Sequence, residues 1–188
     1  METAEVLYTD LSTFTNGSYN PGKRWRIISW YFINYFVFNS ALPWPYQWKL
    51  RILHSFGAQV GKGLVIKTKV RIKYPWHLTI GDHCWIGESV WIDNLSKVTI
   101  GNNVCISQGA MLLTGNHDYS QPNFAFRLGN IEIEDGVWIG AKSIVCPGVS
   151  CKTHAVLTVN SVATKNLDRW SIYAGNPARK IRDRKMHS

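Results

Sequence analysis

An aliphatic residue recurs at every sixth position from Val60 onward, and this period restricts the fold more than any other feature of the chain. A strand of six residues cannot bury its apolar side chain alone, but stacked coils of such strands share one continuous core. Three hexapeptides form one coil. The fifteen core positions are, coil by coil, Val60, Ile66, Ile72; Ile80, Ile86, Ile92; Ile100, Ile106, Leu112; Ile133, Ile139, Val145; and Cys151, Leu157, Ala163.

The first coils repeat every twenty residues, because their third hexapeptide carries two extra residues. Glycine follows many core residues, as in Ile80-Gly81 and Ile139-Gly140, and predicts a corner with a positive φ angle. The pattern predicts an all-β fold, a triangular parallel β-helix of about five coils over residues 57–168. Smaller residues four positions after a core residue leave room beside it, and these are Cys84, Ala110, Ser143, Ala155 and Ser161.

The open ends of such a prism need covers. Residues 1–56 are predicted to form an aromatic-rich helical cap, in which residues 24–38 are apolar on nearly every side. The apolar stretch 27–42, interrupted by Asn34, is shorter than the roughly 20 residues that a membrane span needs. Two interpretations stay open: a cap packed on the prism and on neighbouring subunits, and peripheral contact with an anionic membrane through residues 24–45. The basic flanking residues are Lys23, Arg24, Arg26, Lys49 and Arg51.

The period breaks after Leu112 and resumes at Ile133, so a loop over residues 113–132 leaves the prism. Long loops on a rigid scaffold often carry function. This loop contains His117, and a histidine is the usual general base at a hydroxyl because its pKa lies near neutrality. His117 is therefore the predicted catalytic base.

The twenty-residue period places Lys97 one coil below His117, and Asp93 and Asn94 below Leu113 and Thr114. We expect Asp93 to orient the imidazole or to bind the acceptor hydroxyl. The alternative is a turn residue at a corner, a position that Asp favours. The predicted acceptor-binding residues are Asn94, Glu88 and Asn116.

Metal chemistry is not expected. Pro122, not histidine, stands five positions after His117, so the loop lacks the converging histidines of a zinc site such as that of the γ-class carbonic anhydrases. The four cysteines form no CxxC pair, and Cys151 belongs to a core row as a small apolar residue.

The net charge of +9 predicts attraction to phosphates, acidic sugars or anionic lipid. The basic residues form no recognition helix or reader motif, so nucleic acid is not an expected partner. Residues 1–5 are acidic and lack the apolar run of a signal peptide. We therefore expect a cytoplasmic protein, or one that is peripheral at the inner face of the cytoplasmic membrane.

Several stretches carry a family pattern. Ile106-Ser107-Gln108-Gly109-Ala110, Thr114-Gly115-Asn116-His117-Asp118-Tyr119, Ser161-Val162-Ala163-Thr164-Lys165 and Ala174-Gly175-Asn176-Pro177-Ala178 resemble the hexapeptide-repeat O-acetyltransferases. Residues 71–76 and 90–95 resemble the exopolysaccharide branch, the colanic acid acetyltransferase (WcaF-like) family. The resemblance spans about residues 20–184 and implies a left-handed β-helix.

The resemblance also implies a homotrimer with active sites between adjacent prisms, acetyl-CoA as co-substrate, and His117 as the base. In two places this chain departs from the sugar acetyltransferases: their acceptor-binding asparagine aligns with Gly87, and a small residue beside the pantetheine aligns with the bulkier Val159. The positions that match their CoA contacts are Ala141, Val159, Thr164, Lys165 and Arg182.

Residues 169–188 are expected to form a short, flexible, basic C-terminal tail. From Lys165 onward, seven Lys and Arg residues stand against Asp168 and Asp183, so this segment is suited to neutralise the phosphates of CoA. The alternative is a tail that only improves solubility. The predicted function is transfer of acetyl from acetyl-CoA to a sugar hydroxyl in exopolysaccharide biosynthesis, on an acceptor that is free or lipid-linked. The alternatives are an amino sugar, serine or antibiotic acceptor, and a non-catalytic membrane-associated scaffold.

Overall fold

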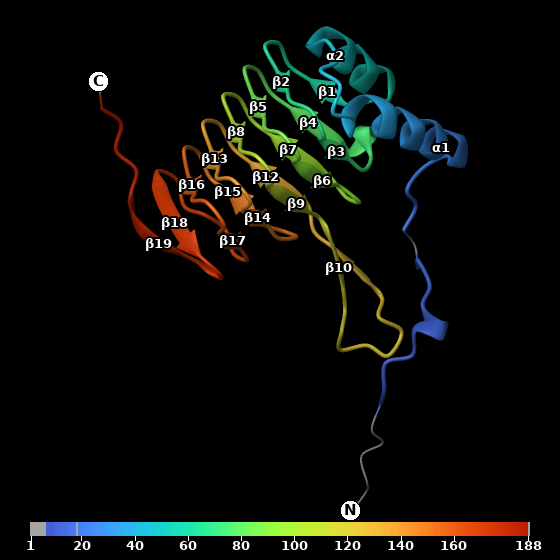
Figure 1. Ribbon diagram of the computed structural model, residues 1–188. Coiled ribbons are helices and arrows are strands. Elements are labelled where there is room, and N and C mark those ends of the chain that lie inside the picture. The colour runs from blue at the N-terminus through green and yellow to red at the C-terminus, as the bar shows by residue number, and fades with distance from the viewer. Residues whose placement is uncertain (1–6, 18, 188) are drawn as a thin grey trace, which may run out of the picture.

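The computed structural model describes residues 7–17 and 19–187, and its centre is a three-sided parallel β-helix (Figure 1). The acidic N-terminal residues used above to predict location therefore lie outside the described residues. Sheet A contains β1 (Gln59–Val60), β4 (Leu78–Ile80), β7 (Val98–Ile100), β12 (Ile131–Ile133) and β15 (Ser150–Cys151). Sheet B contains β2 (Val65–Ile66), β5 (Trp85–Ile86), β8 (Cys105–Ile106), β13 (Trp138–Ile139), β16 (Val156–Leu157), β18 (Ser171–Gly175) and β19 (Ala178–Asp183). Sheet C contains β3 (Arg71–Ile72), β6 (Trp91–Asp93), β9 (Met111–Leu113), β14 (Ile144–Val145) and β17 (Val162–Ala163).

The predicted core rows point into the prism. All fifteen residues are buried except Val60, which is partly buried at the first coil. The register confirms the twenty-residue period, since Val60 pairs with Ile80 and Ile80 with Ile100. Ile100 then pairs with Ile133, so the loop is extruded without disturbing the stack. The parallel β-helix and its helical cap are confirmed.

The glycines that follow core residues serve another purpose than the one predicted. Gly87 and Gly140 do not have a positive φ; instead, an added Cβ would lie 2.7 Å from the Gln108 amide nitrogen and 2.6 Å from that of Val159. Corners of successive coils approach too closely for a side chain at these positions. Positive φ angles occur further along the corners, for example at Lys142 and Asn160.

The cap consists of α1 (Arg24–Ile33), the π-helical turn η2 (Asn34–Phe38) and α2 (Tyr46–Ser55). It covers the end of the first coil, whose backbone groups have no preceding coil to pair with. Three side chains supply the missing partners: Trp30 donates to the Ile72 carbonyl (2.8 Å), Asn34 accepts from the Ile72 amide (3.3 Å), and Lys49 donates to the carbonyls of Ile66 (3.2 Å) and Lys67 (2.9 Å). The cap thus protects the sheet edges from pairing with another chain.

Lys49 was predicted to be one of the basic residues that flank the apolar stretch, but its side chain is buried, with 1% of its surface exposed. Desolvation lowers the pKa of its ammonium group, and the two carbonyls compensate part of that cost. Within the described residues, no helix has the length and apolar character needed to cross a membrane.

The C-terminal segment is an ordered hairpin instead of a flexible tail. β18 pairs in parallel with β16 and adds a sixth level to sheet B, and β19 returns antiparallel to it. Ser171 and Tyr173 alternate with the half-buried Ile172, the pattern of a strand with one covered face. The Arg184 guanidinium then donates to the carbonyls of Gly136 (2.9 Å) and His154 (3.1 Å).

The short 3₁₀ helices are η1 (Leu11–Thr13) and η3 (Pro75–His77).

Candidate active site

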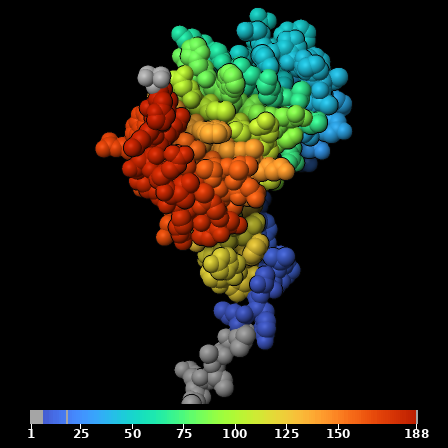
Figure 2. All heavy atoms as spheres, turned by 60° about the vertical axis from the view of Figure 1, so that its left-hand side comes forward, coloured from blue at the N-terminus to red at the C-terminus, as the bar shows by residue number. Residues whose placement is uncertain are grey.

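The loop leaves the corner between sheets C and A as a two-stranded hairpin, β10 (Gly115–His117) and β11 (Phe126–Leu128). His117 stands opposite Phe126 in this hairpin. The hairpin projects from the prism beside the N-terminal segment in two views of the molecule (Figures 1 and 2). The break in the repeat therefore marks a regular element that holds His117 away from the prism wall.

The imidazole of His117 is fixed on three sides. Its Nδ1 lies 2.7 Å from the Phe124 carbonyl oxygen, and its ring stacks on Phe124 (centroids 4.4 Å apart) and Phe126 (4.9 Å). A carbonyl oxygen can only accept, so Nδ1 carries the proton and donates it to this bond. In the neutral imidazole, Nε2 then has a free lone pair. Asn116 supports the same turn, because its Oδ1 accepts from the His117 amide (2.8 Å).

A second element, the N-terminal strap (residues 10–17 with Tyr19), packs on this hairpin. The Asp10 amide donates to the Pro122 carbonyl (2.8 Å). The centroid of the Phe14 ring lies 5.8 Å from that of the His117 ring and 5.4 Å from that of the Phe126 ring. The Tyr19 hydroxyl donates to the Leu95 carbonyl (3.2 Å). The sequence interpretation assigned this segment to the helical cap and missed the strap, for which isolated aromatic residues in a polar stretch were the only signal.

We expect Phe14→Ala to lower the turnover number by about tenfold to 10²-fold, because the imidazole loses the aromatic wall that fixes its position. Steady-state kinetics with a saccharide acceptor should show this loss in kcat with little change in the KM for acetyl-CoA. Leu11→Ala is the matched control, since Leu11 is an exposed apolar residue of the strap. Equal kcat values for Phe14→Ala and the wild type would contradict a positioning role for the strap.

Asp93 lies one coil below Leu113, as the period predicts. Its Oδ1 is buried without a hydrogen-bond partner, and the Lys73 ammonium is 3.5 Å away, too far for a good hydrogen bond. Burial is the main cause of the raised pKa values of Tyr19 and Tyr74, and the negative charge of Asp93 adds a smaller contribution to both. No hydrogen bond joins Asp93 to His117 among the residues that the structure describes, and the Phe124 carbonyl instead orients the imidazole.

Asn94 has a structural position. It is completely buried, its Oδ1 accepts from the Tyr74 amide (3.0 Å), and its Nδ2 donates to the Tyr74 carbonyl (2.6 Å). Both polar atoms of the amide are therefore used inside the prism. This geometry leaves Asn94 unable to reach an acceptor without breaking the corner of its coil.

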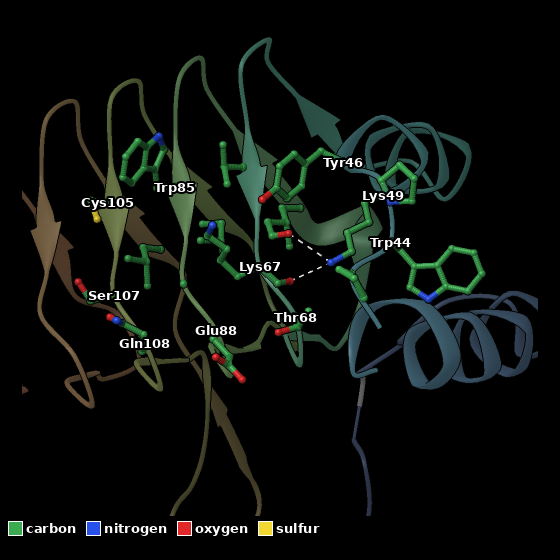
Figure 3. Close-up of a pocket in the computed structure, with 17 residues that line it drawn as sticks. Trp44, Tyr46, Lys49, Lys67, Thr68, Trp85, Glu88, Cys105, Ser107 and Gln108 are labelled. Atoms are coloured by element: carbon green, nitrogen blue, oxygen red, sulfur yellow. Dashed lines mark hydrogen bonds between the residues drawn. The ribbon is translucent and has the colours of Figure 1, made fainter. Parts of the chain in front are cut away.

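Glu88 lies at a different corner, between sheets B and C, where it forms an exposed ion pair with Lys69 (3.1 Å). It lines a groove of about 830 Å³ between the start of α2 and sheet B (Figure 3). Trp85 and Tyr46 provide exposed aromatic rings in this groove. Polar groups join them from neighbouring coils, namely Lys67, Thr68, Ser107 and Gln108.

The five positions that match CoA contacts fall on three parts of one subunit. Ala141 and Val159 stack at the corner between sheets B and C, since the Asn160 amide donates to the Ala141 carbonyl (2.9 Å). The same corner continues toward the groove, where the Lys142 amide donates to the Gln108 carbonyl (2.8 Å). The remaining three are exposed elsewhere: Thr164 and Lys165 at the corner between sheets C and A, and Arg182 on β19.

No protein-family model matches the chain. A protein of Escherichia coli (strain K12) named colanic acid biosynthesis acetyltransferase WcaF is 34% identical over 176 residues, covering 93% of this chain and 97% of that protein. Nodulation protein L of Rhizobium meliloti (strain 1021) is 33% identical over 136 residues, covering 71% and 74%. The acetyl-CoA complex of the hexapeptide-repeat acetyltransferase VCA0836 from Vibrio cholerae shares the fold, with a TM-score of 0.76, 20% identity and 87% of each chain covered.

The similarity to the Escherichia coli protein covers 93% of this chain and therefore extends well beyond the repeat itself. Such identity over nearly the full length of both chains is more than a shared β-helix would produce by itself. The chain belongs to the colanic acid biosynthesis acetyltransferase (WcaF) family of hexapeptide-repeat enzymes and is an acyltransferase.

Proposed function

We propose that this enzyme transfers an acetyl group from acetyl-CoA to a sugar hydroxyl during surface-polysaccharide biosynthesis, with His117 as general base. The observation that carries the proposal is the 2.7 Å hydrogen bond from Nδ1 of His117 to the Phe124 carbonyl, which leaves Nε2 able to accept a proton. The relative named for colanic acid biosynthesis supports a saccharide as the acceptor class.

In the proposed reaction, Nε2 of His117 takes the proton of the sugar hydroxyl while that oxygen attacks the thioester carbonyl carbon. The new C–O bond gives a tetrahedral oxyanion, which a backbone N–H at a coil edge would stabilise. Collapse breaks the C–S bond, and the imidazolium returns its proton to the departing thiolate. The products are the sugar ester and CoA, and no enzyme nucleophile takes part.

The proposed binding path for acetyl-CoA is the corner between sheets B and C. Ala141 and the exposed Val159 stack on successive coils of this corner and are the proposed contacts of the pantetheine arm. The exposed cations Lys165, at the corner between sheets C and A, and Arg182, on β19, are suited to bind the phosphates, and Thr164 adjoins Lys165 in the chain. The acetyl end would then point toward the groove that contains Gln108 and Glu88.

The hairpin that carries His117 leaves the corner between sheets C and A, whereas the groove lies beside the corner between sheets B and C. Within one subunit, His117 therefore does not face the groove. We propose a homotrimer in which the hairpin of one subunit reaches the groove of the next. In that arrangement the saccharide lies between His117 and the aromatic rings of Trp85 and Tyr46, and the partly exposed side chain of Asp93 is our candidate for a further contact with the acceptor. We also propose that the enzyme acts in the cytoplasm and that its acceptor saccharide is linked to a lipid.

An acceptor panel assayed for free CoA release tests this function. We expect release with neutral and acidic oligosaccharides, and none with glucosamine, serine or chloramphenicol as the only acceptor. Mass spectrometry of the product should locate the added acetyl as an ester, which mild alkali removes. Exclusive formation of an amide product would contradict the proposed sugar O-acetylation while leaving the acyltransferase assignment intact.

A further inference from the structure

The cap has two apolar faces, and only one of them packs on the prism. Trp30 and Phe38 face inward at 2% and 0% exposure. The opposite face of α1 and η2 exposes six large apolar side chains, each at least 49% exposed: Trp25, Ile28, Tyr31, Phe32, Tyr35 and Phe36. We call these six residues the outer face of the cap. Their spacing of three and four residues places them along one side of a continuous helical segment about 18 Å long.

The charge around the outer face has one sign. Between Leu11 and Gly81 the sequence contains no Asp or Glu and ten Lys or Arg residues: Lys23, Arg24, Arg26, Lys49, Arg51, Lys62, Lys67, Lys69, Arg71 and Lys73. Arg24 begins α1 and Lys23 directly precedes it; both are exposed, as is Arg51 on α2. The cap therefore carries exposed cations without a carboxylate of its own, while Glu88 and Asp93 of the second coil pair with Lys69 and Lys73 of the first. In Figure 1 the cap lies at the end of the prism that begins with β1.

A neighbouring subunit is a poor match for this surface. Cyclic symmetry relates subunits by rotation about one axis, so equivalent levels of adjacent prisms meet. The outer face would then meet another subunit at the level of its cap, where Lys23, Arg24 and Arg51 are exposed, and like charges would oppose the contact. An anionic bilayer supplies both missing partners, because its interface accommodates aromatic rings and its surface potential attracts Lys and Arg.

We propose that the outer face of the cap docks on an anionic lipid bilayer, with Trp25, Phe32 and Phe36 entering the interface and Lys23 and Arg24 contacting lipid headgroups. The helix lies in the plane of the interface, because ten α-helical residues and one π-helical turn are too short to span it. This inference is independent of the reaction assigned above. It gives the enzyme an orientation in which the cap end of the prism faces the membrane.

Flotation of the full-length protein with vesicles tests the inference. We expect binding to vesicles in which one third of the phosphatidylcholine is replaced by phosphatidylglycerol, little binding to pure phosphatidylcholine, and weakening at high salt. The triple variant Trp25→Ser, Phe32→Ser, Phe36→Ser should lower the partition coefficient by about 10²-fold. The double variant Lys23→Glu, Arg24→Glu should lower the partition coefficient by about tenfold, and it should stay folded because both positions are exposed.

Matched controls stand at the opposite end of the prism. Ile181→Ser and Arg169→Glu change an exposed apolar and an exposed basic residue there, and both should partition like the wild type. Absent binding of the wild type to anionic vesicles, or equal binding by the charge variant, would overturn the inference. So would a smaller assembly in light scattering for the aromatic variant, because the outer face would then be a subunit contact.

Discussion

Replacement of His117 by alanine should lower the turnover number by about 10²–10⁴-fold, the range that loss of a general base produces. The affinity for CoA should stay nearly unchanged, because His117 lies on the hairpin and not on the corner that carries Ala141 and Val159. The rates are measured by thiol release, and the dissociation constant of CoA by calorimetry. A loss in kcat and kcat/KM of equal size is the signature of an interaction made only in the transition state.

His54→Ala is the matched control for this experiment. His54 is exposed near the end of α2 and has no place in the proposed mechanism, so its removal should leave turnover close to that of the wild type. If His117→Ala retains turnover within a factor of three or so of the wild type, the assignment of the base is wrong, since a general base contributes far more. If the variant loses both turnover and the ability to bind CoA, the result would instead indicate a damaged fold.

Trp30→Ala should lower the free energy of unfolding by about 3–5 kcal/mol, which is the cost of emptying a buried tryptophan site. Trp30 is 2% exposed, and its ring packs against Phe38 and Phe56 with both centroid distances at 5.2 Å. Its indole N–H also satisfies the Ile72 carbonyl at the first coil. Denaturant titrations at one fixed protein concentration measure the change, because the stability of an oligomer depends on concentration.

Two variants separate packing from hydrogen bonding in this prediction. Trp30→Phe should cost less, about 1–3 kcal/mol, because it keeps most of the ring but leaves the carbonyl unsatisfied. Trp25→Ala changes a tryptophan on the other side of the same helix, and at 65% exposure it should change stability by no more than about 0.5 kcal/mol. Equal losses for Trp30→Ala and Trp25→Ala would show that the cap does not dock as described.

The repeat made the prism predictable because its contacts have a fixed sequence offset. Ile66, Ile86 and Ile106 meet at intervals of one coil, so each strand specifies its neighbours through a local period. The role of Gly87 was not predictable in this way. Only glycine fits at this position, because an added Cβ would lie 2.7 Å from the backbone of the next corner. The sequence gives no sign of that distance.

The candidate site was predictable only in part. The interrupted period identified His117 and placed Asp93 one coil below Leu113, and both positions hold. Asn94 follows the same period, yet its side chain turns inward to the Tyr74 backbone. Polar residues at a corner look alike in sequence whether they face solvent or the prism, because the direction of a side chain depends on the backbone of that corner.

By itself, the sequence determined the coil, its length, the buried rows and the position of the loop, because residues that contact one another in adjacent coils are separated by a fixed number of positions. Only the tertiary structure decided how the imidazole of His117 is held. The Phe124 carbonyl fixes the proton on Nδ1 of His117, and Phe14 packs on the ring from a strap about one hundred residues earlier in the chain. Contacts of that kind follow no period, and they exist only after the cap, the prism and the hairpin have brought distant segments together.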